Sequence, residues 1–211
     1  MGMLNNNSKS KMTSTDAEYQ LNHSEFIVLG LIAEGPSHAY QLNEKIKERG
    51  MRDWTSIGKS SVYRVIKSLR KEGYADRWIE EVDNRVIKVY QITEKGLKTL
   101  KKHVYEVLKS FYGRNDEDFY VAFSMLPLLS KEKQIEALNY SIENMKIHIT
   151  ELKQMLEENS QMPLNVTGLF IHPIEILKTD IKFLEWVLEQ IKKGKGSAVP
   201  KDYINQEKKE K

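Results

Sequence analysis

The pattern of apolar and polar residues predicts three helices in the first third of the chain. The segment SEFIVLGLIAEGP carries apolar residues around nearly its whole helical circumference, which is typical of a buried helix, with Ser24 as N-cap and Gly35-Pro36 as its end. A second helix, 37–49, has one apolar face, Ser37 as cap and Gly50 as stop. The third helix covers 59–72 and stops at Gly73.

After the third helix the period changes to that of β-strands. The stretch YADRWIEEVDNRVIKVYQIT is rich in β-branched and aromatic residues, and it predicts strands at about 74–81 and 85–92 with a tip at Val82–Asn84. A further helix begins in TEKGLKTLKKHVYEVLKSFY. Three helices followed by a hairpin is the order of a winged helix-turn-helix domain.

The second half of the chain contains two apolar seams with alternating spacings of three and four residues, which are typical of coiled coils. The turn between them lies in NSQMPLNVTGLFIHP, and Pro173 is expected in the first turn of the second helix. The seams can close on each other as an antiparallel hairpin or pair across a dimer. The small core of one short hairpin favours the dimer. The predicted dimerisation residues are Ile135, Leu138, Ile142, Met145, Ile149, Leu152, Leu177, Ile181, Leu184 and Leu188.

These patterns predict a mainly α fold with a small β-hairpin, in which a winged helix-turn-helix domain precedes a coiled-coil-like helical dimerisation domain. The expected divisions follow composition and breakers such as GRNDED at 113–118. They are a flexible leader at 1–22, the winged helix-turn-helix domain at 23–112, the dimerisation domain at 119–193 and a disordered tail at 194–211.

Charge is distributed unevenly along the 211 residues. The whole chain has a formal net charge of only +3, but residues 25–102 carry +5 and residues 103–193 carry −4. This asymmetry indicates an anionic partner for the first half.

The absence of certain residues and motifs narrows the function classes. The chain has no cysteine, which fits a reducing, cytoplasmic location, and no apolar run long enough to span a membrane. It has no Gly-rich phosphate loop or dinucleotide fingerprint, and its five histidines lack metal-ligand spacing. We therefore expect no enzyme activity, no cofactor and no metal.

The third helix carries the clearest functional signal. On a helical wheel its aliphatic residues gather on one side, while Ser60, Arg64, Lys67 and Lys71 gather on the other, flanked by Tyr63 and Arg70. A solvated face and a membrane-surface helix are the alternatives. The small, β-branched apolar face argues against the membrane, and the hairpin that follows favours nucleic acid. Small polar residues in the first turn suit phosphate contact, and the cations can reach phosphates or base edges.

Four motifs in this order resemble the PadR family of bacterial transcription regulators. They are GPSHAYQL at 35–42, SIGKSSVYRVIKSLRKEGY at 56–74, YQITEKG at 90–96 and FSMLPLLS at 123–130. The two seams and FLEWVLEQI resemble the long class of the family, which has a virulence-activator-like C-terminal half. The resemblance implies a homodimer in which helix 37–49 supports the reader helix 59–72 and the hairpin is the wing.

The resemblance also assigns positions near DNA. Tyr40 and Tyr63 match two tyrosines of the family. The chain departs from the family at two positions, because the family often has Gly where Ala39 stands and Pro where Arg64 stands. The wing tip is also unusually acidic. Together with the helix's own pattern, this predicts a DNA-binding set made of His38, Tyr40, Lys59, Ser60, Ser61, Tyr63, Arg64, Lys67, Lys71, Asn84, Arg85 and Lys88.

The resulting hypothesis is a homodimeric repressor that binds a palindromic double-stranded DNA operator. The alternative is a helical protein–protein adaptor whose winged domain does not read DNA, which the acidic wing tip favours. Some regulators of the family bind a small aromatic or hydrophobic effector between their domains. The aromatic residues that could line such a pocket are Trp54, Trp78, Phe111, Tyr112, Phe119, Tyr120, Phe123 and Trp186.

Overall fold

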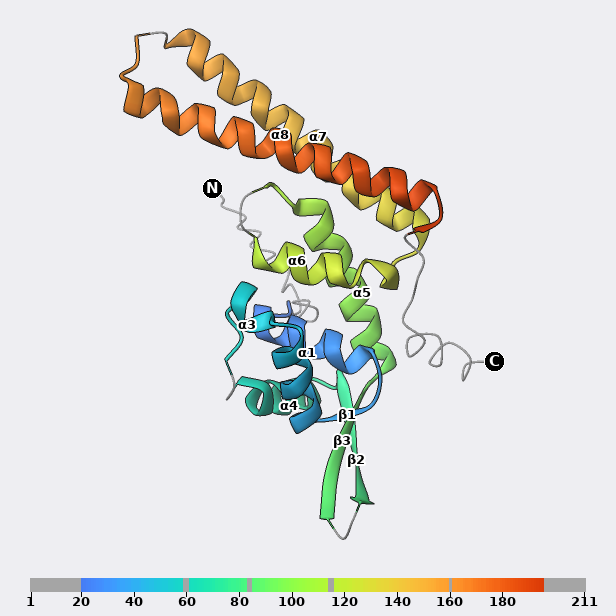
Figure 1. The fold of residues 1–211 in the computed structure, drawn as a ribbon. Helices are drawn as coiled ribbons and strands as arrows, with labels where there is room; N and C mark the ends of the chain where they lie inside the picture. The colour runs from blue at the N-terminus through green and yellow to red at the C-terminus, as the bar shows by residue number, and fades with distance from the viewer. Residues whose placement is uncertain (1–19, 59–60, 83–84, 114–115, 160, 196–211) are drawn as a thin grey trace, which may run out of the picture.

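The structure is a computed structural model that describes residues 20–58, 61–82, 85–113, 116–159 and 161–195. Four short helices and a β-hairpin lie at one end of the described molecule, and a long helical hairpin lies at the other (Figure 1). Two further helices connect these ends. The predicted class, mainly α with a small antiparallel sheet, is confirmed.

Helix α1 (His23–Ala33) forms the centre of the winged domain. Its residues from Phe26 to Ala33 are all buried, as its unbroken apolar circumference predicts. Its cap is Asn22, whose side chain accepts from the Glu25 amide in a capping box, so the prediction of Ser24 was wrong by two positions. The paired side chain of Glu25, three residues on, explains why Asn22 is the better cap.

The second helix begins later than predicted. Ser37–His38 form a short strand, β1, and α2 (Ala39–Glu48) is capped by His38 rather than Ser37. The backbone of Ser37 is instead part of the sheet, because it pairs with Tyr90 of the wing. Gly50, with φ of 57°, ends the helix as predicted, and a short unpredicted helix, α3 (Met51–Trp54), follows.

Helix α4 (Ser61–Lys71) is the predicted reader helix, and Gly73 ends it in a Schellman motif. The Tyr74 amide donates to the Leu69 carbonyl and the Gly73 amide to the Arg70 carbonyl, with Gly73 at φ of 75°. The Thr93 hydroxyl then donates to the Gly73 carbonyl at 2.7 Å. The end of the reader helix is therefore fixed to the base of the wing.

Strands β2 (Ala75–Val82) and β3 (Arg85–Ile92) form the wing, and each lies within one residue of its predicted range. The sheet has the order β1-β3-β2, with Ala75 opposite Ile92 and Val82 opposite Arg85. The predicted tip includes residues 83–84, which lie outside the described residues.

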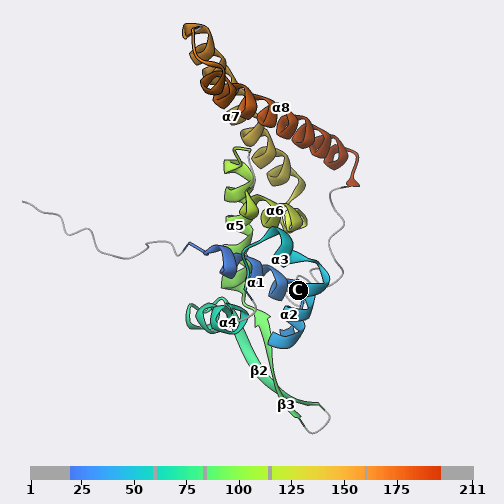
Figure 2. The same ribbon diagram turned by 60° about the vertical axis from the view of Figure 1, so that its left-hand side comes forward.

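Helices α5 (Glu94–Ser110) and α6 (Glu117–Ser124), with the 3₁₀ turn η1 (Leu126–Leu128), join the two ends of the molecule (Figure 2). Thr93 caps α5 through the Gly96 amide. Gly96 has no room for a side chain, since a Cβ there would lie 2.1 Å from the Tyr74 carbonyl oxygen. This glycine lets α5 start directly against the end of the reader helix.

Helices α7 (Lys131–Glu158) and α8 (Leu164–Lys192) form an antiparallel hairpin, which is the less favoured of the two arrangements that the seams allow. One expectation was wrong: Pro173 lies inside α8 rather than in its first turn, because the helix begins at Leu164, directly after Pro163. A proline at this position removes the N–H that would bond the Leu169 carbonyl. The heptad spacing read from Ile174 onward could not show that the helix begins so much earlier.

The seam residues are covered within their own chain. Leu138, Met145 and Leu184 have no exposed surface, and most other members of both seams are also buried. Helix α7 packs against α5 as well, where the Ser141 hydroxyl donates to the carbonyls of Leu108 and Lys109. A dimer remains a prediction, but the residues predicted to mediate it already form the core of one hairpin.

Candidate nucleic-acid interface

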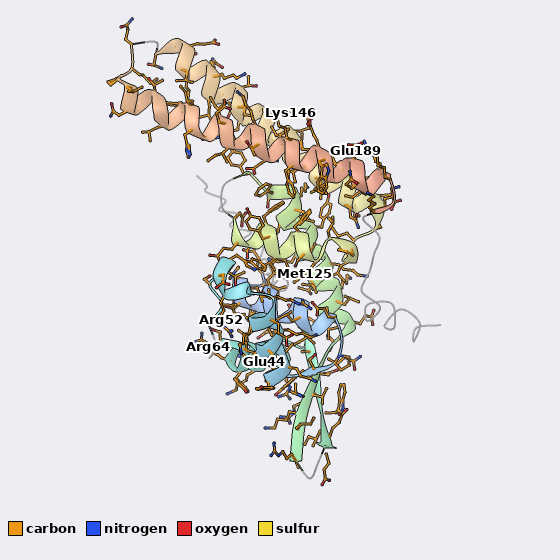
Figure 3. The ribbon with its side chains drawn as sticks, viewed as in Figure 1. Glu44, Arg52, Arg64, Met125, Lys146 and Glu189 are labelled. Carbon is orange, nitrogen blue, oxygen red and sulfur yellow. The ribbon has the colours of Figure 1, made fainter. Side chains whose placement is uncertain are left out.

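Helix α4 divides into a buried face and an exposed cationic face, as the helical wheel predicts. Val62, Val65, Ile66 and Leu69 pack into the core. The opposite face is exposed, and Figure 3 labels Arg64 at the end of the molecule remote from the α7–α8 hairpin. The exposed side chains of α4 are Tyr63, Arg64, Lys67, Arg70 and Lys71.

A buried carboxylate ties the reader helix to the core. The Ser68 hydroxyl of α4 donates to Glu25 Oε1 at 2.8 Å, and the Asn22 amide donates to the other oxygen at 3.1 Å. Glu25 is almost fully buried, so these hydrogen bonds compensate the loss of its hydration. Sequence reasoning missed this group, because Glu25 stands in an apolar run without a visible partner.

The first turn of α2 presents one exposed tyrosine beside a histidine with a structural role. Tyr40 is 64% exposed and Tyr63 of α4 is 61% exposed, so both predicted tyrosines reach solvent from neighbouring helices. His38 Nδ1 accepts from the Gln41 amide at 3.2 Å, which caps α2. Its ring also stacks on Tyr40, with centroids 6.3 Å apart. His38 therefore orients Tyr40, whether or not His38 itself contacts DNA.

The wing carries charges of both signs. Arg85 and Lys88 are exposed, and so are Glu80 and Glu81 on the facing strand. Two apolar side chains, Ile79 and Val86, are also exposed on this hairpin. Neither residue was predicted as part of a site, although their side chains break the expected polar character of an exposed strand face.

The remaining predicted contacts divide into two groups. Ser61 is half-buried at the first residue of α4. Lys59, Ser60 and Asn84 lie outside the described residues. The structure thus brings Tyr40, Tyr63, the exposed cations of α4 and the wing cations to one end of the molecule, without a described position for the turn before α4.

Among the described residues, no group of three or more His, Asp or Glu side chains has the arrangement of metal ligands. Within the same residues, no helix is long and apolar enough to cross a membrane.

The order of α1, α2, α4 and the β2–β3 hairpin, with an exposed cationic face on α4, defines a winged helix-turn-helix domain. Residues 28–102 match the sequence model of the family described as "Transcriptional regulator PadR-like family". This segment runs from within α1 to the middle of α5, so the winged domain is similar in sequence to the PadR-like family of transcriptional regulators.

Solved structures that are similar to this chain include structures of PadR and of a PadR-like regulator. A Bacillus subtilis PadR in complex with operator DNA has 19% identity and a TM-score of 0.36, covering 79% of this chain and 98% of that one. A PadR-like transcriptional regulator from Bacillus cereus has 17% identity and a TM-score of 0.35, covering 81% and 99%. B. subtilis PadR in complex with p-coumaric acid has 18% identity and a TM-score of 0.32, covering 80% and 98%.

No curated protein sequence matches the chain.

Proposed function

We propose that the protein is a homodimeric transcriptional regulator that binds double-stranded DNA through α4 and represses transcription from a palindromic operator. The observation that carries the proposal is the coincidence of two findings. The segment that matches the PadR-like family, 28–102, contains the helix whose whole exposed face is cationic or phenolic. Such a face, backed by a helix-turn-helix, suits the major groove.

The side chains of α4 divide the work of binding. Arg64 and Lys67 project from the middle of the exposed face, where they reach base edges or phosphates, and a bidentate arginine contact favours guanine. Lys71 and the wing cations Arg85 and Lys88 lie towards the periphery and contact phosphates. Two-fold symmetry of the dimer predicts half-sites about 10 or 20 base pairs apart.

The alternative function is a protein–protein adaptor. It is supported by the exposed Glu80 and Glu81 on the wing, which repel a phosphate backbone. DNA binding and adaptor function give opposite results in the experiment that follows.

We expect the protein to bind the DNA that flanks its own gene with an affinity that falls as salt rises. Each phosphate contact releases a counterion, so the log–log slope should be about −0.9 per contact. Fluorescence anisotropy with labelled duplexes measures this slope, and a random duplex of equal length is the control for sequence preference. Absence of binding to every flanking fragment at low salt would favour the adaptor.

The second subunit is proposed to contact the outer face of the helical hairpin instead of its seams. The seam side chains are buried in their own chain, whereas Tyr140 and Ile147 of α7 and Leu169 and Trp186 of α8 are exposed. Large apolar side chains of this kind are common at interfaces between subunits.

A small aromatic or hydrophobic effector is proposed to bind a cavity of about 560 Å³ beside α8. Of the eight aromatic residues that the sequence suggests, Tyr112 lines this cavity, with its ring 4.6 Å from that of His148. Phe111, Phe119 and Phe123 stack on one another instead and form part of the packing between α5 and α6. The cavity combines an apolar wall with three polar rings, from Tyr112, His148 and His172, which suits a small ligand.

Gly168 offers a way to test this cavity. It lines the cavity near the start of α8, and a Cβ there would meet no atom within 4 Å. With p-coumaric acid as probe, we expect the wild type to show a rise in melting temperature and weaker DNA binding, and Gly168→Phe to show neither. Lys182→Phe, at an exposed position of the same helix, should respond like the wild type. An equal response from Gly168→Phe would place the ligand elsewhere.

A further inference from the structure

A single carboxylate oxygen joins the reader-helix loop to the helix that leads into the C-terminal half. Glu117 is the first residue of α6, and its Oε2 accepts from the Ser56 amide at 2.8 Å and from the Ser56 hydroxyl at 2.9 Å. Ser56 lies between α3 and α4, in the segment through which the chain enters the reader helix. Because the acceptor is a carboxylate, these hydrogen bonds are stronger than hydrogen bonds to a neutral oxygen.

His23, the first residue of α1, lies between Glu117 and its neighbour Asp118. Its Nδ1 is 2.5 Å from Asp118 Oδ1. Its Nε2 is 3.0 Å from the Glu117 oxygen that Ser56 contacts, but the geometry of this second contact is not that of a hydrogen bond. An imidazole that faces a carboxylate with each nitrogen is best satisfied as the doubly protonated cation. The ring therefore places a positive charge between two adjacent acids.

The surrounding charges favour that cation. The hydrogen bond to Asp118, together with the negative charges of Asp118, Glu117 and Asp116, raises the pKa of His23 above 6.5 against the opposing effect of burial. The hydrogen bond to His23 in turn lowers the pKa of Asp118. From α5, His103 faces the same carboxylate, and burial lowers its pKa.

The remaining contacts make this junction rigid on both sides. On the loop side, the Thr55 hydroxyl donates to the Met51 carbonyl at 2.7 Å, and Ile57 is buried. On the α6 side, Asp116 caps the helix and Phe119 stacks on Phe111 at the end of α5. Figures 1 and 2 both show α6 directly beside α3 and α1. A shift of α6 would therefore pull on the loop before α4.

We propose that Glu117 is a positioning residue for the reader helix: through Ser56 it fixes the loop before α4, and through His23 it fixes that loop to the start of α1. This inference rests on the DNA-binding function proposed above. A reader helix held in its binding position before it meets DNA loses less conformational entropy on binding, and so binds more tightly. Glu117 does not touch the DNA itself.

The protonation state of His23 gives the junction a direction of pH dependence. A histidine whose pKa is raised in the folded protein contributes stability that is complete below about pH 6.5 and is lost as the pH rises through the raised value. The pKa of Asp118 is lowered, so this group changes the stability of the folded protein only at acid pH. The pKa of His103 is also lowered, so this group changes the stability only below about pH 6.5. The wild type should therefore lose DNA affinity as the pH rises above about 6.5.

The test measures DNA affinity at about pH 6 and about pH 8, on either side of the histidine range, with a flanking duplex that the wild type binds. Glu117→Gln should bind about three- to tenfold more weakly at the lower pH, because the contacts to Ser56 lose their charged acceptor. Ser56→Ala should lose less, since its amide contact remains. His23→Asn should abolish the pH-dependent loss. Glu106→Gln, which removes a charge from an exposed site on α5, is the matched control and should behave as the wild type.

The outcomes separate this inference from the proposed function. If the wild type binds no duplex at either pH, DNA binding itself is overturned. If the wild type binds and Glu117→Gln equals Glu106→Gln at both pH values, the role of Glu117 is overturned while DNA binding stands. If His23→Asn keeps the pH dependence of the wild type, the role of His23 is wrong. Circular dichroism melts establish that each variant is folded.

Discussion

Replacing Arg64 and Lys67 with alanine is expected to lower operator affinity by about a hundredfold or more. Each side chain is exposed at the middle of the α4 face, and loss of one arginine that reads a base costs about 1–3 kcal/mol, where each 1.4 kcal/mol is tenfold. The melting temperature should hardly change, because substitutions at exposed sites alter stability by about 0.5 kcal/mol or less. Anisotropy titrations on operator and random duplexes measure the loss.

The two single variants show which contact carries sequence information. A loss on operator alone assigns the side chain to a base, whereas an equal loss on random DNA, with a salt slope smaller by about one, assigns it to a phosphate. Lys182→Ala removes one positive charge from α8, at the other end of the molecule, and controls for net charge. If the double variant binds as Lys182→Ala does, α4 is not the reading element.

Replacing Ile142 and Leu184 together with aspartate is expected to unfold the α7–α8 hairpin. Both side chains are buried between the two helices, and each aspartate would lose several kcal/mol of hydration without a partner. Circular dichroism should show a loss of helix, and light scattering should show unfolded or aggregated chains. A well-folded monomer would instead indicate that the seams pair between two subunits.

Trp186→Asp is the counterpart of this variant on the outer face. Trp186 is 57% exposed on α8, and its ring lies 6.2 Å from that of Phe183. The substitution should therefore preserve the helical content, and it should convert the dimer to monomers in light scattering. A persistent dimer would place the subunit interface on another surface.

Local patterns in the sequence predict the elements of the winged domain well. The all-apolar circumference of α1, the glycines at 50 and 73 and the alternating residues of the wing each depend on neighbours a few positions away. The exposed face of α4 follows from the same local periodicity. The helix caps were less predictable, since Asn22 and His38 are chosen by partners three residues ahead, Glu25 and Gln41.

Contacts between distant parts of the chain could not be predicted in this way. Ser56 and Glu117 are separated by 61 positions, and nothing in either local pattern indicates the other. The packing partner of each apolar seam is equally unpredictable from the local sequence. A spacing of three and four residues describes a face that needs covering, and it is the same whether the cover comes from α7, from α5 or from another subunit.

Helix α5 is a rigid connection between the winged domain and the α7–α8 hairpin. At 17 residues and about 1.5 Å per residue it is about 25 Å long. At its start Thr93 is bonded to the end of the reader helix, and near its far end the carbonyls of Leu108 and Lys109 are bonded to Ser141 of α7. A change in the crossing angle between α5 and α7 would therefore swing the base of the wing and the end of α4 together. In a dimer, the same rotation would alter the distance between the two α4 helices.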